Sequence, residues 1–333
     1  MSPWVLRGLR NGVVTTRWPA RPDPYASGWR GPATVLDPAA GEGADGLEGL
    51  CPTGAISTQP DGAGPDGAER DGTQPDGAER DGAERDGAER DGAERDGAER
   101  ADRGRVRLDQ GKCILCGRCV GARPDVFGWS TGPGAAALTR GGLVVPEIPG
   151  TAENLAAIRD GLRARTAALQ RSVHLRHVDA GSDGAEEQEI YALLGPVYDV
   201  HRLGIFFTAS PRHADVLLVT GAGARGMIAP LRRTFDGMPD PKIVIAVGTD
   251  AVSGGLVSPS YATTGGVSDT VGVDVWLPGS PPSPFSILHA LLLALGRLPT
   301  VQQTAVQQTA VRQAAERQTA ERRTQRRDQG EGQ

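Results

Sequence analysis

Short runs of Val, Ile and Leu alternate with segments of helical spacing between residues 172 and 298, and this alternation restricts the fold more than any other feature. Four runs are predicted to be strands: SVHLRHVDAG, ADVLLVTG, PKIVIAVG and VDVWLPG. Three segments are predicted to be helices: EEQEIYALLGPVYDVHRLG, MIAPLRRTFDGM and SPFSILHALLLALGRL. Nearly continuous apolar strands separated by helices are typical of a parallel sheet covered on both faces. The sequence therefore predicts an α/β fold whose ligands bind at the carboxyl ends of the strands.

The chain has four cysteines, and their positions indicate a metal cluster. Cys113, Cys116 and Cys119 lie in KCILCGRC, and Cys51 lies in LCPTGAI. Bacterial ferredoxins use C-x2-C-x2-C-x3-C-P runs, in which the cysteine before the proline ligates the cluster of the other run. CILCGRC matches the head of one run and CPTGAI the tail of another, while Arg123 stands where a closing cysteine would be expected. We therefore predict one [4Fe–4S] cluster held by the four cysteines.

Other uses of the same thiols are open from the sequence. A structural zinc ion held by all four thiolates is one alternative, and four unligated thiols are another. Two disulfides fit less well, because three of the cysteines are closely spaced and no secretory segment is visible.

Two segments have a composition that argues against a folded core. Residues 60 to 100 hold six copies of DGAER without a large apolar residue, and we expect disorder there. The six copies contribute about −6, against a formal net charge of −5 for the whole chain, so net charge says little about the folded part. The insert is interpreted as tolerated in a long loop, with a docking role as the alternative.

The C-terminal residues 299 to 333 are rich in Gln, Ala and Arg, and we expect a frayed helix or disorder. Their Arg cluster is interpreted as a solvated tail, with contact to anionic lipid or nucleic acid as the alternative. No apolar stretch reaches 18 residues, so no membrane-spanning segment is predicted. The N-terminus lacks the apolar core of a signal peptide, which favours a cytoplasmic protein unless a partner holds it at a membrane.

Several longer segments follow one another in a known order: RGLRNGVVTTRWPARPDP, the two cysteine segments, HLRHVDAGS, SPRHADVLLVTG, MPDPKIVIAVG and PGSPPSP. In this order the chain resembles the small, electron-transferring subunit of energy-converting membrane-bound [NiFe] hydrogenases. It is also similar to the homologous subunit of complex I, the NADH-quinone oxidoreductase. The resemblance implies a flavodoxin-like domain preceded by a small ferredoxin-like domain. It also implies a large catalytic subunit, membrane subunits, quinone reached through the complex, and a place on the inner face of the cell membrane.

This resemblance gives the expected domain organisation. The ferredoxin-like domain is predicted in two parts, 1–58 and 105–145, separated by the insert 59–104. A linker helix is expected over 146–171, the flavodoxin-like domain of the NADH-quinone oxidoreductase type over 172–298, and the tail over 299–333.

The chain departs from the family at the ends of its strands. The family holds a proximal [4Fe–4S] cluster with cysteines in G-S-C-x-G-C-E, G-x-C-A and P-G-C-P-P. The matching positions here are Asp183, Glu186, Asp250 and Ser280, so thiolates do not hold a proximal cluster in this chain. Glu187 matches the family's glutamate, which the resemblance links to proton or quinone chemistry. A solvated glutamate at a helix start is the equal alternative.

The replacements allow two interpretations. Oxygen ligands suit Mg²⁺ or Ca²⁺, so the three carboxyl groups and the hydroxyl could form a hard-metal site. A hydrated cavity without a cofactor is the favoured alternative, because buried carboxylates repel one another unless they are paired.

A second motif offers a different class of function. Gly221, Gly223 and Gly226 fit G-x-G-x-x-G after a strand, and Asp250 follows the next strand, as in dinucleotide-binding domains. The resembling family uses the same loop for structure, without a nucleotide.

The remaining polar residues do not indicate a specific functional site. His174, His177, His201 and His213 are interpreted as packing or polar contacts, because no second Cys or His cluster accompanies them. Arg212 corresponds to a family position that faces the large subunit, with a surface ion pair as the alternative.

We therefore predict an electron-transfer subunit that keeps one [4Fe–4S] cluster, lacks the proximal one and has no nucleic-acid partner. The alternatives are a non-redox structural or assembly subunit and an NAD(H)-binding oxidoreductase.

Overall fold

The computed structural model describes most of the chain outside the two biased segments. The described residues are 3–23, 28–38, 46–59, 105–146, 151–167, 169, 172–257 and 259–298. The DGAER insert and the C-terminal tail, for which disorder was expected, lie outside the described residues.

The C-terminal half contains one five-stranded sheet whose neighbouring strands are all parallel. Its strands are β6 (Val173–Asp179), β7 (Ile205–Phe207), β8 (Val216–Thr220), β9 (Ile243–Val247) and β10 (Val275–Leu277). The spatial order is β10-β9-β8-β6-β7. Counted along the chain this is 2-1-3-4-5, which is the flavodoxin-like order. The predicted α/β, flavodoxin-like class is therefore confirmed for this half.

Each central strand alternates between two apolar layers, as the period of two requires. Val216 and Leu218 of β8 lie in one buried cluster, whereas Leu217 and Val219 lie in the other. The first layer includes α7 (Pro284–Ala294) together with residues of α3 (Thr151–Thr166) and α4 (Ala185–Ala192). The second layer includes residues of α5 (Ile228–Asp236) and α6 (Thr249–Ser253). Both faces of the sheet are thus covered, which is why its strands are apolar without interruption.

The predicted helix over EEQEIYALLGPVYDVHRLG was wrong in its second half. Helix α4 ends at Ala192, shortly before Gly195 and Pro196, and the chain continues into the short 3-10 helix η5 (Val200–Leu203). Proline removes a backbone donor and clashes with a preceding helical turn, so the helix does not continue. The next residues form the edge strand β7, which the sequence pattern missed.

Antiparallel pairs form the N-terminal half. Strand β1 (Arg30–Val35) pairs with β4 (Phe127–Thr131), and β3 (Arg105–Asp109) lies between β2 (Ile56–Gln59) and β5 (Val144–Val145). A third buried cluster, with Val106, Leu108 and Phe127, forms the core of this half. Its ferredoxin-like class stays a prediction.

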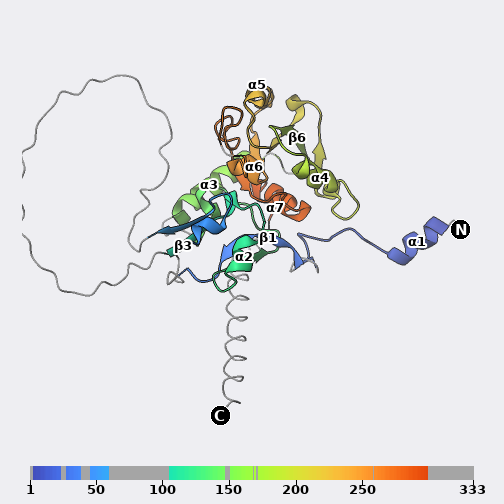
Figure 1. The fold of residues 1–333 in the computed structure, drawn as a ribbon. Helices are drawn as coiled ribbons and strands as arrows, with labels where there is room; N and C mark the ends of the chain where they lie inside the picture. The colour runs from blue at the N-terminus through green and yellow to red at the C-terminus, as the bar shows by residue number, and fades with distance from the viewer. Residues whose placement is uncertain are drawn as a thin grey trace, which may run out of the picture.

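Helix α1 (Pro3–Asn11) lies outside these cores, whereas helix α3 contributes Leu162 to the first layer. Helix α1 stands apart in Figure 1, and its Val5, Leu6 and Leu9 are exposed. Helix α3 falls within the segment expected to be a linker helix. Within the described ranges, every helix is too short or too polar to cross a membrane.

The two halves meet at the carboxyl end of the parallel sheet, where α6 follows β9 (Figure 1). The hydroxyl of Thr249 donates to the carbonyl of Cys113 at 2.9 Å and accepts from the backbone N–H of Gly279 at 3.0 Å. Ser253 donates to the carbonyl of Gly111 at 2.8 Å. The cysteine loop of the N-terminal half is therefore fixed on the edge where ligands of such sheets bind.

Replacing Thr249 with Val tests this junction. Valine keeps the shape but leaves the carbonyl of Cys113 and the N–H of Gly279 without their buried partner. We expect the free energy of unfolding to fall by about 1–3 kcal/mol. Chemical denaturation followed by circular dichroism measures the change. The control is Thr234→Val on α5, which removes a solvent-exposed bond of the hydroxyl to the carbonyl of Pro230, and a change within about 0.5 kcal/mol is expected. Equal effects of the two substitutions would contradict the junction.

Candidate functional site

Strand pairing brings Cys51 next to the loop of the other three cysteines. Cys51 precedes β2 and Cys113 follows β3, and these strands pair with Ile56 opposite Leu108. The backbone N–H of Asp109 donates to the carbonyl of Ala55 at 2.8 Å. The hydroxyl of Thr53 donates to the carbonyl of Lys112 at 2.6 Å. The two cysteine segments are therefore joined across the whole DGAER insert.

Three of the four thiols belong to or pack against one apolar cluster. Cys113 and Cys119 are buried in the N-terminal cluster, Cys51 packs against it half-buried, and Cys116 is exposed. Burial raises the pKa of Cys113, and repulsion from Cys51 and Cys116 adds to this effect. Burial also raises the pKa of Cys119 to about 11, with added repulsion from the other three thiols. Cys113 and Cys119 lie in the same buried cluster, and Cys51 packs against it.

The loop itself is shaped by two residues in the left-handed region. Leu115 has φ 58° and Gly117 has φ 73°, which turn the chain sharply between Cys113 and Cys119. Asp109 fixes the approach to this turn. Its carboxylate accepts from the N–H of Gly111 at 2.9 Å and from the guanidinium of Arg140 in a two-bond pair at 2.7 and 2.6 Å.

Backbone groups approach the sulfur atoms. The N–H of Ala55 donates to Cys51 Sγ at 3.3 Å, and the hydroxyl of Thr53 lies 3.2 Å from the same sulfur. Backbone hydrogen bonds from Leu115 to Cys113 and from Val120 to Cys119 lower the pKa values of those thiols and oppose their burial. Such bonds favour the thiolate form, which is the form that binds metal.

The donor set has the chemistry of an iron–sulfur site. Soft thiolates are the ligands that such clusters and zinc prefer. In the part of the chain that the structure describes, no three His, Cys, Asp or Glu side chains are arranged to hold a metal ion. Cluster binding therefore requires the four thiols to turn toward a common centre beside the apolar cluster that contains Cys113 and Cys119.

Arg123 supplies no closing ligand. Its guanidinium pairs with Asp125 at 2.7 Å directly after the short helix α2 (Arg118–Ala122). In place of the cysteine that would close a second C-x2-C-x2-C-x3-C-P motif, the chain thus has an arginine that forms an ion pair with Asp125.

The four positions that carry oxygen instead of sulfur follow strands of the parallel sheet. Asp183 and Glu186 follow β6, Asp250 follows β9, and Ser280 follows β10. Glu186 is 1% exposed, and its Oε2 has no hydrogen-bond partner. Burial, followed by repulsion from Asp250, Asp183 and Glu187, raises the pKa of Glu186 to about 7. Burial and repulsion from Asp183 also raise the pKa of Asp250. The three carboxyl groups therefore lie close enough to oppose one another's ionisation.

Glu187 lies in a separate hydrogen-bond network, so it is not the solvated glutamate of the alternative interpretation. Its carboxylate accepts from Ser182 Oγ at 2.7 Å and from Thr220 Oγ1. His177 Nε2 lies 3.3 Å from Glu187 Oε1 and 3.0 Å from Thr220 Oγ1. Burial lowers the pKa of His177, and attraction to Glu187 partly opposes this. His177 is thus a polar contact here, as interpreted, and its partners come from helix α4 and strand β8.

The glycine loop after β8 is explained by packing of the chain against itself. A Cβ at Gly221 would overlap the backbone of Gly181 and Ser182, and one at Gly223 would overlap the carbonyl of Gly266. Both glycines also have positive φ, of 86° and 73°. Close backbone contacts and positive φ therefore account for glycine at both positions.

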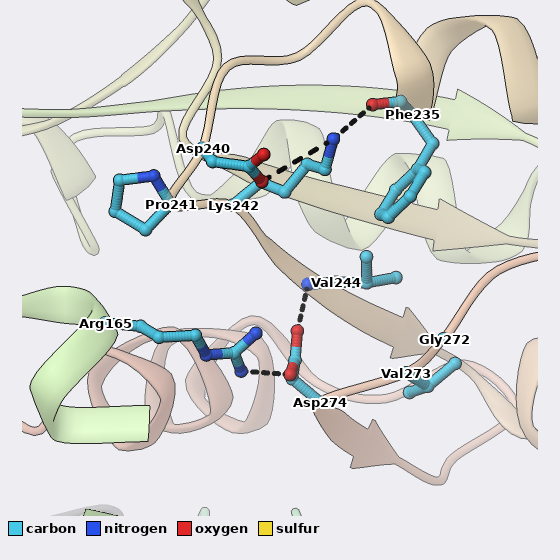
Figure 2. A pocket seen from close by; sticks show the side chains of 9 residues that line it. All are labelled: Arg165, Phe235, Asp240, Pro241, Lys242, Val244, Gly272, Val273 and Asp274. Atoms are coloured by element: carbon cyan, nitrogen blue, oxygen red, sulfur yellow. Dashed lines mark hydrogen bonds and ion pairs between the residues drawn. The ribbon is translucent and has the colours of Figure 1, made fainter. Parts of the chain in front are cut away.

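A pocket of about 690 Å³ lies at the opposite end of the sheet, where β9 and β10 begin. Figure 2 shows its charged side chains already engaged: Lys242 donates to the carbonyl of Phe235 at 3.2 Å, and Arg165 pairs with Asp274. Asp274 also accepts from the N–H of Val244 at 2.9 Å. These pairs connect α3, α5 and the sheet, and the pocket contains none of the predicted site residues.

Two alanine substitutions in the glycine loop separate packing from nucleotide binding. Gly223→Ala places a Cβ against the carbonyl of Gly266 at positive φ, and we expect a loss of about 1–3 kcal/mol in the free energy of unfolding. Gly226→Ala meets open space, and a change within about 0.5 kcal/mol is expected. Thermal or chemical denaturation measures both. Binding of NADH to the native chain, lost in Gly226→Ala, would contradict the packing role.

Comparison with known proteins shows that part of the chain matches a described family. Residues 184–294 match the family model of the NADH ubiquinone oxidoreductase 20 Kd subunit. Formate hydrogenlyase subunit 7 of Escherichia coli is 41% identical over 146 residues, which are 44% of this chain and 56% of that protein. The probable membrane-bound hydrogenase subunit mbhJ of Pyrococcus furiosus is 41% identical over 130 residues, which are 39% of this chain and 78% of that protein.

A solved structure was also found. A chain of the membrane-bound sulfane sulfur reductase, an archaeal respiratory membrane complex, aligns with 46% of this chain and 87% of its own length. The sequence identity is 24% and the TM-score is 0.35.

Proposed function

The chain belongs to the family of the 20 Kd subunit of NADH ubiquinone oxidoreductase, and from this we propose that it is an electron-transfer subunit of a complex-I-like or hydrogenase-like membrane complex. In this proposal it holds one [4Fe–4S] cluster on Cys51, Cys113, Cys116 and Cys119. Its partners are a large catalytic subunit and membrane subunits, which place it on the inner face of the membrane and give access to quinone.

One observation supports the proposal: the β2–β3 pairing brings Cys51 beside the segment that leads into Cys113. The bond from Thr53 to Lys112 holds the two segments together directly beside Cys51 and Cys113. Because these thiols make up one set of four ligands, they support a single cluster. When bound, such a cluster supplies one-electron transfer.

The residues around the thiols suit such a role. The N–H of Ala55 and the backbone bonds from Leu115 and Val120 point at ligand sulfurs, and hydrogen bonds to ligand sulfurs tune reduction potential. Thr249 anchors the carbonyl of Cys113 to the turn after β9. The four-cysteine site therefore borders the strand ends, where electrons would pass to a partner.

The strand ends supply no thiolate for a further centre. Asp183, Glu186, Asp250 and Ser280 occupy the matching positions, so in this proposal another protein of the complex contributes the next centre. Glu187, held by Ser182, Thr220 and His177, is proposed as a proton-accepting group at the same edge.

A structural subunit without redox function is the second candidate. The observation that favours it is the same loss of thiolates from all four strand-end positions. It differs from the first proposal in requiring no reducible centre.

Electron paramagnetic resonance of the anaerobically reconstituted and reduced chain tests the proposal. We expect about four irons per chain and the signal of a single reduced cluster. Cys116→Ser should abolish or alter that signal, because it removes a ligand, whereas the exposed thiol contributes little to the core. Ser57→Ala on the exposed side of β2 is the control and should leave the signal unchanged. Bound zinc without a reducible centre, or two cluster signals, would contradict the proposal.

A further inference from the structure

Helix α1 presents apolar side chains to water. Val5, Leu6 and Leu9 are exposed, and 71% of the surface of Leu9 is accessible. Leu9 lies three residues after Leu6 and four after Val5, so the three side chains share one face of the helix. None of the three belongs to a buried cluster of the sheet or of the N-terminal half. A contiguous apolar face of this kind indicates a surface that another molecule covers.

The chain that follows α1 is fixed to the parallel-sheet half. The hydroxyl of Thr15 donates to the carbonyl of Pro196 at 2.7 Å, and the N–H of Thr16 donates to the carbonyl of Val197 at 2.8 Å. These bonds place the segment after α1 against the turn that follows α4.

Further apolar side chains are exposed on both sides of this contact. Val13 and Val14 lie just before the two threonines, and Tyr191, Leu194 and Val197 lie at the end of α4 and in the turn after it. The exposed apolar face of α1 is therefore followed by an exposed apolar surface on the folded part of the chain.

Arginines accompany the apolar side chains. Arg7 and Arg10 lie on α1, Arg17 and Arg21 follow it, and all four are exposed. At 3.6 residues per turn, the two arginines of α1 fall on the side of the helix away from Val5 and Leu9. Residues 1 to 22 contain no Asp or Glu, although the whole chain has a formal net charge of −5. The segment is thus positively charged in an acidic chain.

An anionic lipid surface matches this combination better than a groove on another protein. A helix with one apolar face and arginines on the polar face lies in the plane of a membrane interface, where anionic headgroups attract the arginines. A groove that binds a helix holds apolar anchors at i, i+3 or i+4, and i+7. The position seven residues after Val5 is Gly12, which has φ 64° just after the helix ends. With nine residues, α1 is too short to cross a bilayer and long enough to lie along one.

We propose that α1 and the segment after it form a binding site for the anionic headgroups of a membrane surface. Val5, Leu6 and Leu9 enter the boundary between headgroups and acyl chains, and Arg7 and Arg10 bind lipid phosphates. This site holds the chain at a membrane by direct contact with lipid, in addition to any contact with membrane subunits. It requires no iron–sulfur cluster, so it stands or falls independently of the proposed function.

Co-sedimentation of the full chain with vesicles tests the inference. We expect binding to vesicles of phosphatidylglycerol mixed with phosphatidylcholine, little binding to phosphatidylcholine alone, and weaker binding as salt rises. Arg7→Gln together with Arg10→Gln should weaken the affinity for the anionic vesicles about tenfold or more, because two cations leave the interface. Leu6→Gln together with Leu9→Gln should weaken it to a similar extent, about tenfold, because the apolar face is lost.

Matched controls carry the same substitutions elsewhere on the surface. Arg232→Gln together with Arg233→Gln changes two exposed arginines of α5, which lies apart from α1 in Figure 1. Leu256→Gln changes a leucine that is 65% exposed in the loop after α6. Both controls should bind the anionic vesicles as the native chain does. Circular dichroism checks that every variant is folded.

Three outcomes would overturn the inference. The first is a native chain that does not bind the anionic vesicles, which would leave the apolar face of α1 to a protein partner. The second is equal binding to both kinds of vesicle, which excludes recognition of anionic headgroups. The third is native affinity in both α1 variants, which would assign lipid binding to another segment such as the arginine-rich residues 299–333. Each of these leaves the proposed function standing, because the signal of a reduced cluster is measured without vesicles.

Discussion

The antiparallel pairing of β2 with β3 is the constraint on which the candidate site depends. It closes a loop that contains the entire DGAER insert and sets Cys51 beside the chain that leads into Cys113. The entropy of closing a loop grows only slowly with its length, so the insert weakens this pairing little. Buried Ile56, Val106 and Leu108 hold the strands together. The hydrogen bond of Thr53 fixes the turn before β2, and that of Asp109 fixes the turn after β3. Without this register Cys51 would not pack against the cluster that contains Cys113 and Cys119.

The parallel sheet adds the second constraint, because the carboxyl ends of its strands converge at one edge. Residues that follow β6 and β9 bring three carboxyl groups to this edge, and the residue that follows β10 brings the hydroxyl of Ser280. Thr249 joins the same edge to the cysteine loop. The resulting neighbourhood combines soft sulfur donors with a buried carboxyl group that lacks a partner. The sulfur donors of this neighbourhood are the physical basis of the proposed function.

Local chemistry explains what the sequence could predict. Strand runs such as VLLVT and IVIAV are apolar because both faces of the sheet are covered. The spacing of Cys113, Cys116 and Cys119 could be interpreted from the sequence because the turn that carries them is formed within one short segment. Strand β7 escaped prediction because three residues are too few for a periodic pattern. The burial of Glu186 depends on the missing Cβ of Gly248, and the partners of Glu187 depend on the register of β6 and β8. An acidic residue in the first turn of a helix ordinarily indicates a solvated helix start, so neither feature is visible in the sequence.

Diffraction from crystals of the iron-loaded chain, with anomalous scattering recorded at the iron absorption edge, tests the central claim most directly. The account predicts one compact iron peak surrounded by the sulfur atoms of Cys51, Cys113, Cys116 and Cys119, with no iron beside Asp183, Glu186 and Asp250. An iron peak that Cys51 does not reach, or a second peak among the carboxyl groups, would contradict it.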